Sequence, residues 1–364
     1  MRTLGGWMSA ALFAAALAYL CPIGFAADVA GDRGKWTAIS EKLVNSIRVG
    51  DLAGVPSEKQ KTTGVAVDRT TGAVFVVLNG SGEIWRSPDK GKTFERIDGG
   101  KISGRCETGW SLNVDPNNGR HMACFMIYGS GGFTLDGGRT WRQFASGPCD
   151  YAAVDWSAVE PRVMLGNKHD GGGRALLSKD AGKTWKLVGT GVESRAGSSI
   201  GVGVVDSGTL LLHRRDNSGI ERSTDDGKTW TQVSKHNPRS RVAVVFKGVI
   251  YWAGAEGLLV SSDKGKSWQV QGTLVDAIQG PFFGEDENHI VVVGSKGFYE
   301  TKDGGKTWEN VLPLAGLEAE LDPNNALLQS NKCRIAWFDS FAWDPIGNAF
   351  YHSRMLEATR KYKR

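Results

Sequence analysis

Five side chains of this 364-residue chain are of the types needed for acid–base chemistry. Three are carboxylates, Glu107, Asp150 and Glu193, and two are histidines, His169 and His213. Two carboxylates that flank a sugar can act as acid and base or as acid and nucleophile, and a histidine can accept or donate a proton near neutral pH. The alternative interpretation is that the carboxylates form salt bridges with nearby arginines and that the histidines are solvated loop residues.

A second set of side chains has the chemistry to hold an acidic sugar. Arginine binds carboxylate and sulfate groups through two parallel hydrogen bonds, and concave sites combine such groups with aromatic side chains. We therefore expect an oligo- or polysaccharide, particularly an acidic one, as the partner. The candidate substrate-binding residues are Arg214, Arg215, Arg241, Arg334, Arg354, Trp252 and Tyr128.

The element that positions these residues is repeated, because one eight-residue pattern occurs six times. It contains a hydroxyl residue, an aspartate, a glycine, a second hydroxyl residue and a final aromatic, as in Ser223-Thr-Asp-Asp-Gly-Lys-Thr-Trp230. Aspartate can accept hydrogen bonds from backbone N–H groups that follow it, and glycine supplies a positive φ, so the pattern predicts a hairpin turn. The six aspartates, interpreted as structural and not catalytic, are Asp89, Asp136, Asp180, Asp225, Asp263 and Asp303.

The six motifs resemble the Asp-box, or BNR repeat, of sialidases, of several other glycoside hydrolases, of sortilin-type receptors and of the photosystem II assembly factor. The resemblance covers nearly the whole chain after its first residues and implies a β-propeller. Sialidases also carry a Tyr/Phe-Arg-Ile-Pro motif near their N-terminus. That motif is missing here, since Cys333-Arg-Ile-Ala336 lacks the proline and lies near the C-terminus.

Four strands are expected in each repeat. Two apolar segments precede each motif, such as 64–68 and 73–78, a third runs into the motif and a fourth leaves it. The motif aspartates are 38 to 47 residues apart. Four antiparallel strands in a period of this length are typical of a propeller blade.

The two ends of the chain complete the blade count. Segments 341–345, 347–353 and 356–362 predict three strands of a further blade, and Gly34-Lys35-Trp36-Thr37 resembles the end of a motif. The predicted fold is therefore all-β, a seven-bladed β-propeller with six Asp-boxes whose last blade is closed by N- and C-terminal strands. Closure of the ring removes exposed strand edges.

In such a ring, the loops that enter the innermost strands and the loops that join second to third strands lie on one face, opposite the motifs. The candidate residues fall in these loops, so we expect one site on an axial, loop-rich face, which we call the rim.

Cys106 and Cys149 begin adjacent inner strands, which predicts a rim disulfide, with buried reduced thiols as the alternative. No closely spaced histidine pair or calcium loop occurs, so no metal site and no cofactor are predicted.

The first residues predict export. Arg2 precedes an apolar run over 7–20 and a small-residue stretch over 24–27, which indicates a signal peptide of residues 1–26 and a single domain over 27–364. The expected location is secreted or periplasmic, with no membrane span after cleavage. The net charge of +5 is spread along the chain, which argues against a nucleic-acid partner.

Together these features predict an exported propeller that acts on or binds carbohydrate, with a glycoside-cleaving enzyme as the favoured function. In a lyase, a histidine would remove a proton beside an arginine-neutralised uronate carboxyl group. In a hydrolase, paired carboxylates would act at an oxocarbenium-like centre. The alternative is a non-catalytic binding or assembly propeller, similar to the photosystem II assembly factor, whose rim docks a protein.

Overall fold

The structure is a computed structural model, and residues 32–364 of it form one unit. The predicted signal segment 1–26 lies outside the described residues. The described residues are 33–46, 62–78, 82–106, 108–145, 149–171, 173–189, 200–214, 218–273, 277–313, 339–354 and 358–364.

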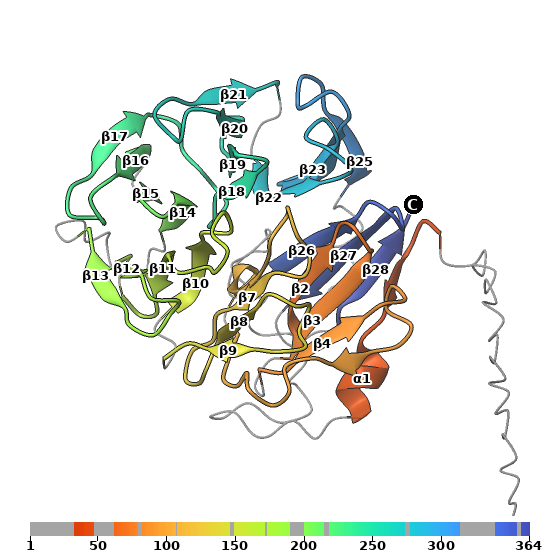
Figure 1. Cartoon of the computed structure of the whole chain (residues 1–364). Helices are drawn as coiled ribbons and strands as arrows, with labels where there is room; N and C mark the ends of the chain where they lie inside the picture. Colours follow the sequence, from red (N-terminus) through yellow and green to blue (C-terminus); the bar gives the residue numbers. More distant parts are fainter. Residues whose placement is uncertain are drawn as a thin grey trace, which may run out of the picture. The chain divides into compact units, whose positions relative to one another are not determined.

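The strands within these residues form seven four-stranded antiparallel sheets, which are arranged in a ring (Figure 1). From the innermost strand outward, blade 1 is β2 (Thr62–Asp68), β3 (Ala73–Leu78), β4 (Ile84–Ser87) and β5 (Glu95–Arg96). Blade 2 is β6 (Leu112–Val114), β7 (Met122–Cys124), β8 (Gly132–Thr134) and β9 (Arg142–Gln143). Blade 3 is β10 (Cys149–Val154), β11 (Met164–Lys168), β12 (Ala175–Ser178) and β13 (Lys186–Val188).

The remaining four blades follow the same order. Blade 4 is β14 (Gly201–Asp206), β15 (Thr209–His213), β16 (Ile220–Ser223) and β17 (Thr231–Ser234). Blade 5 is β18 (Val244–Phe246), β19 (Val249–Gly254), β20 (Gly257–Ser261) and β21 (Gln269–Gln271). Blade 6 is β22 (Ala277–Phe283), β23 (Ile290–Gly294), β24 (Gly297–Thr301) and β25 (Glu309–Pro313). Blade 7 is β26 (Asp339–Asp344), β27 (Ala349–Arg354), β28 (Arg360–Lys363) and β1 (Trp36–Ala38).

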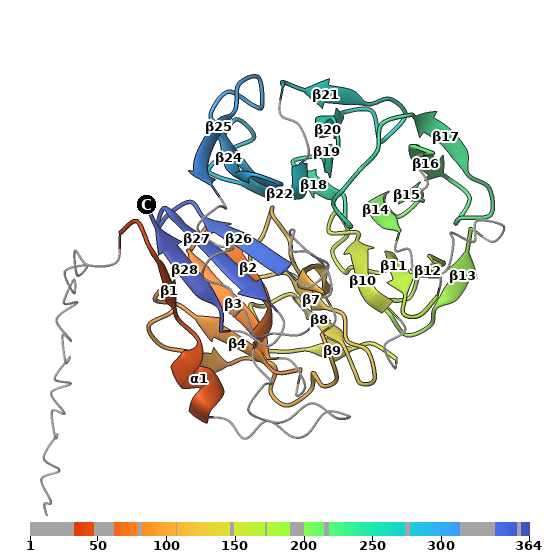
Figure 2. The ribbon, with the colours of Figure 1, turned by 180° about the vertical axis from the view of Figure 1, so that it is seen from behind.

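Blade 7 is closed by the N-terminal strand, as the sequence predicts. In β1, Trp36 pairs with Tyr362 of β28, and the backbone N–H of Ile39 donates to the carbonyl oxygen of Thr359 at 2.9 Å. Figure 2 shows β1 beside β28 at the edge of this sheet. Every sheet of the ring therefore has four strands, and the seven-bladed prediction is confirmed.

The core is divided among the seven interfaces between neighbouring blades. Because side chains alternate along a strand, β3 directs Val74 and Val76 toward blade 7 and Phe75 and Val77 toward blade 2. Each interface also receives the final aromatic of a motif, which packs against the preceding blade. These aromatics are Phe94, Trp141, Trp185, Trp230, Trp268 and Trp308, and Trp36 takes the same role in blade 7.

Each motif folds into the predicted turn, with the same hydrogen bonds six times. In blade 2, the Asp136 carboxylate accepts the Thr134 hydroxyl at 2.7 Å, the Thr140 N–H at 2.9 Å and the Thr140 hydroxyl at 2.6 Å. Gly138 has a φ of +91°, and a Cβ there would stand 2.6 Å from Ile97 in the preceding blade. The aspartates thus hold turns, on the opposite side of each blade from the candidate chemistry.

These bonds lead to a prediction for Asp136. Slight burial acts to raise its pKa, but the bonds from Thr140 and Thr134 outweigh it and lower the pKa from 3.8 to about 2. The stabilisation by the ionised group is therefore present above about pH 4 and is lost as the pH falls toward 2. Asp136→Ala should lower the thermal unfolding midpoint at neutral pH, and the difference from wild type should shrink in acid.

The matched control is Asp226→Asn, which neutralises an exposed carboxylate of another motif turn that is paired with the exposed Lys179, and which keeps a side chain suited to the φ of +61° there. This change should have little effect, because exposed ion pairs contribute little to stability. Equal melting points for wild type and Asp136→Ala at neutral pH would contradict the structural role of the motif aspartates.

Two short helical segments within the described residues accompany the sheets. The helix α1 (Glu41–Ser46) follows β1 and places Leu43 against blades 7 and 1. The 3₁₀ turn η3 (Gly109–Ser111) precedes β6 and is capped by Thr108, whose hydroxyl accepts the Trp110 N–H. Among the described residues, no helix is long and apolar enough to cross a bilayer.

Candidate functional site

Three candidate residues meet at the rim, on the boundary between blades 2 and 3. Asp150 lies in β10, His169 directly follows β11, and Tyr128 lies in the segment that joins β7 to β8 of blade 2. Asp150 Oδ1 is 2.7 Å from His169 Nδ1, and His169 Nε2 is 3.0 Å from Tyr128 Oη. Two predicted catalytic residues and one predicted binding residue therefore form a continuous chain of hydrogen bonds, which we call the rim relay.

The rim relay runs from the interior to the solvent. Asp150 is 5% exposed, whereas Tyr128 is 72% exposed. Burial raises the pKa of Asp150 above its ordinary value, although the hydrogen bonds from His169 and Asn167 oppose this. Because Asp150 Oδ2 accepts the Asn167 amide at 2.8 Å, the carboxylate is held in one orientation toward the imidazole.

The hydrogen bonds select a tautomer of His169. An ionised Asp150 accepts a hydrogen bond from the Nδ1–H group, which leaves a lone pair on Nε2 for the Tyr128 hydroxyl. The imidazole can then take the phenolic proton, and the carboxylate stabilises the imidazolium that forms. The exposed Asp170 carboxylate also lies 3.3 Å from His169 Nε2.

The backbone of Tyr128 is held in an unusual conformation. Its φ of +55° is in the left-handed region, which non-glycine residues seldom adopt. On either side, Arg105 pairs with Ile127 and Ser103 pairs with Ser130 through reciprocal backbone hydrogen bonds of 2.9–3.1 Å. A Cβ on Gly129 would stand 2.3 Å from the Ser103 carbonyl oxygen, so only glycine fits beside Tyr128. This hairpin fixes the exposed phenol against His169.

A guanidinium group lies beside the phenol. The Arg105 Cζ is 5.3 Å from the centre of the Tyr128 ring, and the His169 ring meets the same ring edge-on. A cation here can stabilise a developing phenolate and can neutralise a bound carboxylate. The rim relay thus combines a buried acid, an imidazole, an exposed phenol and a fixed cation.

Pairing with a carboxylate is not what distinguishes His169 in this protein. Within the described part of the chain, four other histidines also face an acidic side chain within 4 Å, including His121 with Asp115 and His289 with Glu300. Of these five, His169 is the one that also contacts an exposed tyrosine hydroxyl among the residues that the structure describes. The phenol, more than the His–Asp pair, marks this position as a candidate active site.

The other predicted catalytic residues do not join the rim relay. Glu107 and Glu193 lie outside the described residues. His213 is buried in β15 and its Nδ1 is 2.8 Å from the carbonyl oxygen of Gly219. The sequence predicts that His213 lies in a loop. In the structure, strand β15 extends through His213, so this residue lies within the sheet of blade 4.

The predicted arginine cluster is divided among different partners. Arg214 is paired with Glu221 at 2.6 Å, and the buried Arg241 lies over the ring of Trp110 at 5.9 Å. The buried Arg354 bonds to Asp339 through both Nε and Nη2, at 2.6 and 3.0 Å. Arg215 and Arg334 lie outside the described part of the chain.

Two expectations need correction. Trp252 is 0% exposed and its indole N–H donates to the Ser240 carbonyl oxygen, so it is a core residue and not a sugar contact. No disulfide joins Cys106 to Cys149, and both thiols are unoxidised. Cys106 packs between blades 1 and 2, whereas Cys149 packs between blades 2 and 3. Matching positions in adjacent blades place the two sulfurs in different interfaces.

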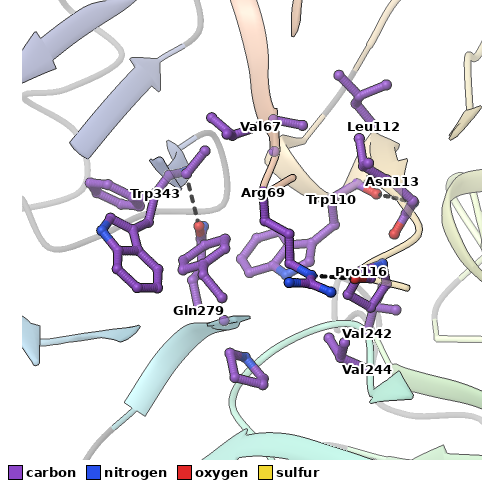
Figure 3. Close-up of a pocket in the computed structure, with 18 of the residues that line it drawn as sticks. Val67, Arg69, Trp110, Leu112, Asn113, Pro116, Val242, Val244, Gln279 and Trp343 are labelled. Atoms are coloured by element: carbon purple, nitrogen blue, oxygen red, sulfur yellow. Dashed lines mark hydrogen bonds between the residues drawn. The ribbon is translucent and has the colours of Figure 1, made fainter. Parts of the chain in front are cut away.

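A cavity of about 160 Å³ lies between the innermost strands of blades 1, 2, 5, 6 and 7. We call it the axial cavity. Figure 3 shows Arg69 in its middle, with Trp343 and Gln279 on one side and Asn113 and Pro116 on the other. Most of its lining is apolar, so its chemistry differs from that of the rim.

Sequence reasoning missed the turn η3, which connects the axial cavity with the rim relay. Its Trp110 lines the cavity, and its Ser111 hydroxyl donates to the carbonyl oxygen of Asp150 at 2.7 Å. Gly109 packs so closely on Ser340 that a Cβ would stand 2.6 Å from it. The signal in the sequence that could have indicated this turn was Trp110, a tryptophan outside the motifs.

Among the described residues, no group of three His, Cys, Asp or Glu side chains is arranged to hold a metal.

Comparison with known proteins agrees with this architecture. The family model of the DUF6242 β-propeller domain matches residues 203–326, and no curated protein sequence matches the chain. Virginiamycin B lyase from Staphylococcus aureus superimposes with a TM-score of 0.50 at 10% identity, over 91% of this chain and 98% of that one.

Two other propellers are similar at lower scores. YCF48 bound to a D1 peptide has a TM-score of 0.46 at 12% identity, over 84% of this chain and 93% of that one. The GH74 enzyme of Niastella koreensis has a TM-score of 0.30 at 14% identity, over 82% of this chain and 63% of that one. With the sheet order above, the family match and the S. aureus structure identify this chain as a seven-bladed β-propeller.

Proposed function

We propose that this chain is an exported enzyme that cleaves an acidic oligo- or polysaccharide by β-elimination at the rim relay. The observation that carries the proposal is the unbroken path from the buried Asp150 through His169 to the exposed Tyr128 hydroxyl. Such a path moves a proton at the surface, where a long polymer can reach it. Arg105, over the Tyr128 ring, would meet the uronate carboxylate.

The elimination is balanced within these groups. Tyr128 Oη, with its own proton taken by His169 Nε2, removes the proton on the carbon next to the uronate carboxyl group. The electron pair of that C–H bond forms the new C=C bond, and the bond to the glycosidic oxygen breaks. The proton returns through the rim relay to the departing oxygen, and Arg105 offsets the charge that develops on the carboxylate.

Elimination is favoured over hydrolysis by the environment of Asp150. Glycoside hydrolysis uses two carboxyl groups on opposite sides of the bond. Within the described part of the molecule, both oxygens of Asp150 are engaged by His169 and Asn167. A carboxylate held in this way orients an imidazole and does not face a sugar.

The test is a panel of uronate-containing, sialylated and neutral glycans, followed by ultraviolet absorbance of unsaturated uronates and by reducing-end assays. We expect new absorbance and new reducing ends with uronate polymers only. Reducing ends without absorbance would indicate hydrolysis and overturn the elimination. Glycan or protein binding without turnover would overturn the enzyme proposal in favour of a docking propeller.

Tyr128→Phe provides the sharpest variant, because it removes one hydroxyl oxygen and keeps the ring. We expect kcat to fall by about 10²–10⁴-fold, with the dissociation constant for the glycan nearly unchanged. Tyr362→Phe, in β28 of blade 7, is the matched control and should keep wild-type turnover. Wild-type turnover by Tyr128→Phe would exclude the phenol from the reaction.

A further inference from the structure

The axial cavity offers a mostly apolar surface that the proposed reaction does not use. Its walls include Val65, Val67, Val114, Val242 and Val244, which come from β2, β6, β18 and the approach to β18. An apolar cavity of about 150 Å³ typically stays dry and accepts a molecule as large as benzene. The axial cavity, at about 160 Å³, is of that size.

The carboxylate and amide side chains of the wall are already occupied. The Gln279 amide bonds to both the carbonyl oxygen of Asp339 and the N–H of Phe341. The Asp115 carboxylate accepts the Asn117 backbone and side-chain N–H groups and faces His121 Nδ1 at 3.2 Å. These groups join neighbouring segments and have little capacity left for a ligand.

The charged group of the wall that has no ionic partner among the described residues is Arg69, a half-buried side chain. Its Nε donates to the carbonyl oxygen of Pro116 at 2.6 Å, and its Nη1 donates to those of Gly284 and Glu285 at 2.7 and 3.4 Å. Its Cζ lies 4.9 Å from the centre of the Phe246 ring. All of these partners are neutral, and none of the ion pairs among the described residues includes Arg69.

A half-buried cation with only neutral partners attracts an anion, because desolvated charges are stabilised by an opposite charge. Arg69 also stands in the middle of the apolar lining, as Figure 3 shows. We propose that the axial cavity binds a small organic carboxylate with an apolar body. The carboxylate would pair with Arg69 while the body packs against the valines and Trp110.

The test uses phenylacetate and its neutral isostere phenylacetamide as probes. Binding to the purified full chain is followed by calorimetry and by the NMR shifts of the indole N–H groups of Trp110 and Trp343, which line the cavity. We expect phenylacetate to bind at least about tenfold more tightly, as a charge-assisted hydrogen bond provides. Equal affinities, or no binding of phenylacetate at millimolar concentrations, would overturn the proposal.

Two variants test the charge of Arg69 and the free volume of the axial cavity separately. Arg69→Met should abolish the preference for phenylacetate, and Val244→Phe should fill the cavity and abolish binding of both probes. Arg222→Met is the matched control, because the Arg222 guanidinium also donates to a carbonyl oxygen, that of Lys264, outside the cavity. If Arg69→Met fails to fold, unchanged probe binding by Val244→Phe would still refute the site. The glycan reaction at the rim should be unaffected by Val244→Phe, so the two proposals fail separately.

Discussion

His169→Ala is expected to lower kcat on a uronate polymer by about 10²–10⁴-fold, the usual contribution of a positioned general base. His169 joins Asp150 to Tyr128, with bonds of 2.7 and 3.0 Å on its two ring nitrogens. Without the imidazole, the phenolic proton has no acceptor within the rim relay. The glycan dissociation constant should change much less than kcat, because Arg105 and Tyr128 remain.

Asp150→Asn tests the same connection from the buried end. An amide in place of the carboxylate can donate to His169 Nδ1 and so favour the tautomer that no longer accepts from Tyr128. We expect a loss of kcat of the same order as for His169→Ala, and no further loss in the double variant, because residues that act as a unit are not additive.

The control for these variants is His289→Ala. His289 is also bonded to a carboxylate, Glu300, at 2.8 Å, but it lies in blade 6. Its removal should leave kcat within about twofold of wild type, since substitutions outside the site act mainly on stability. A loss of activity in His289→Ala as large as in His169→Ala would show that the effect comes from the fold and would contradict the catalytic assignment.

Asp339→Ala is expected to destabilise the protein by about 3–5 kcal/mol, the effect of removing one partner from a buried ion pair. Asp339 is 0% exposed at the start of β26 and accepts hydrogen bonds from Arg354 at 2.6 and 3.0 Å. His352 Nε2 also lies 2.8 Å from the same carboxylate. Without Asp339, the buried Arg354 charge loses this partner in the blade that closes the ring. Urea unfolding provides the measurement.

The pH dependence gives an independent check on Asp339. Burial acts to raise its pKa, but the contacts with His352 and Arg354 outweigh burial and hold the pKa at about 2, below the ordinary 3.8. The stabilisation is therefore present above about pH 4 and is lost as the pH falls toward 2. Asp339→Asn should remove this part of the acid dependence. Asp226→Asn, which breaks the exposed pair with Lys179 and suits the positive φ of that residue, should cost less than about 1 kcal/mol. A similarly small effect of Asp339→Ala would refute the assigned role.

The candidate site was only partly predictable. Asp150 and His169 were identified because each begins or ends a strand at the rim, and strand ends of neighbouring segments meet on one face. The catalytic assignment of Tyr128 needed the structure, since its position depends on the left-handed backbone at φ +55° and on the hairpin between Arg105 and Ile127. No local pattern in the sequence specifies the distance from that phenol to His169.

The sequence by itself determined the ring: the repeated turns, the four strands of each blade and the pairing of Trp36 with Tyr362. The turns and strands depend on hydrogen bonds within eight residues and on strand alternation, which are local and therefore visible in the order of residues. The pairing of the two ends follows because each end carries only part of a blade. Only the tertiary structure decided which polar groups converge. Trp252 faces the core, and Cys106 and Cys149 enter different interfaces, because the twist and packing of adjacent blades set the direction of each side chain.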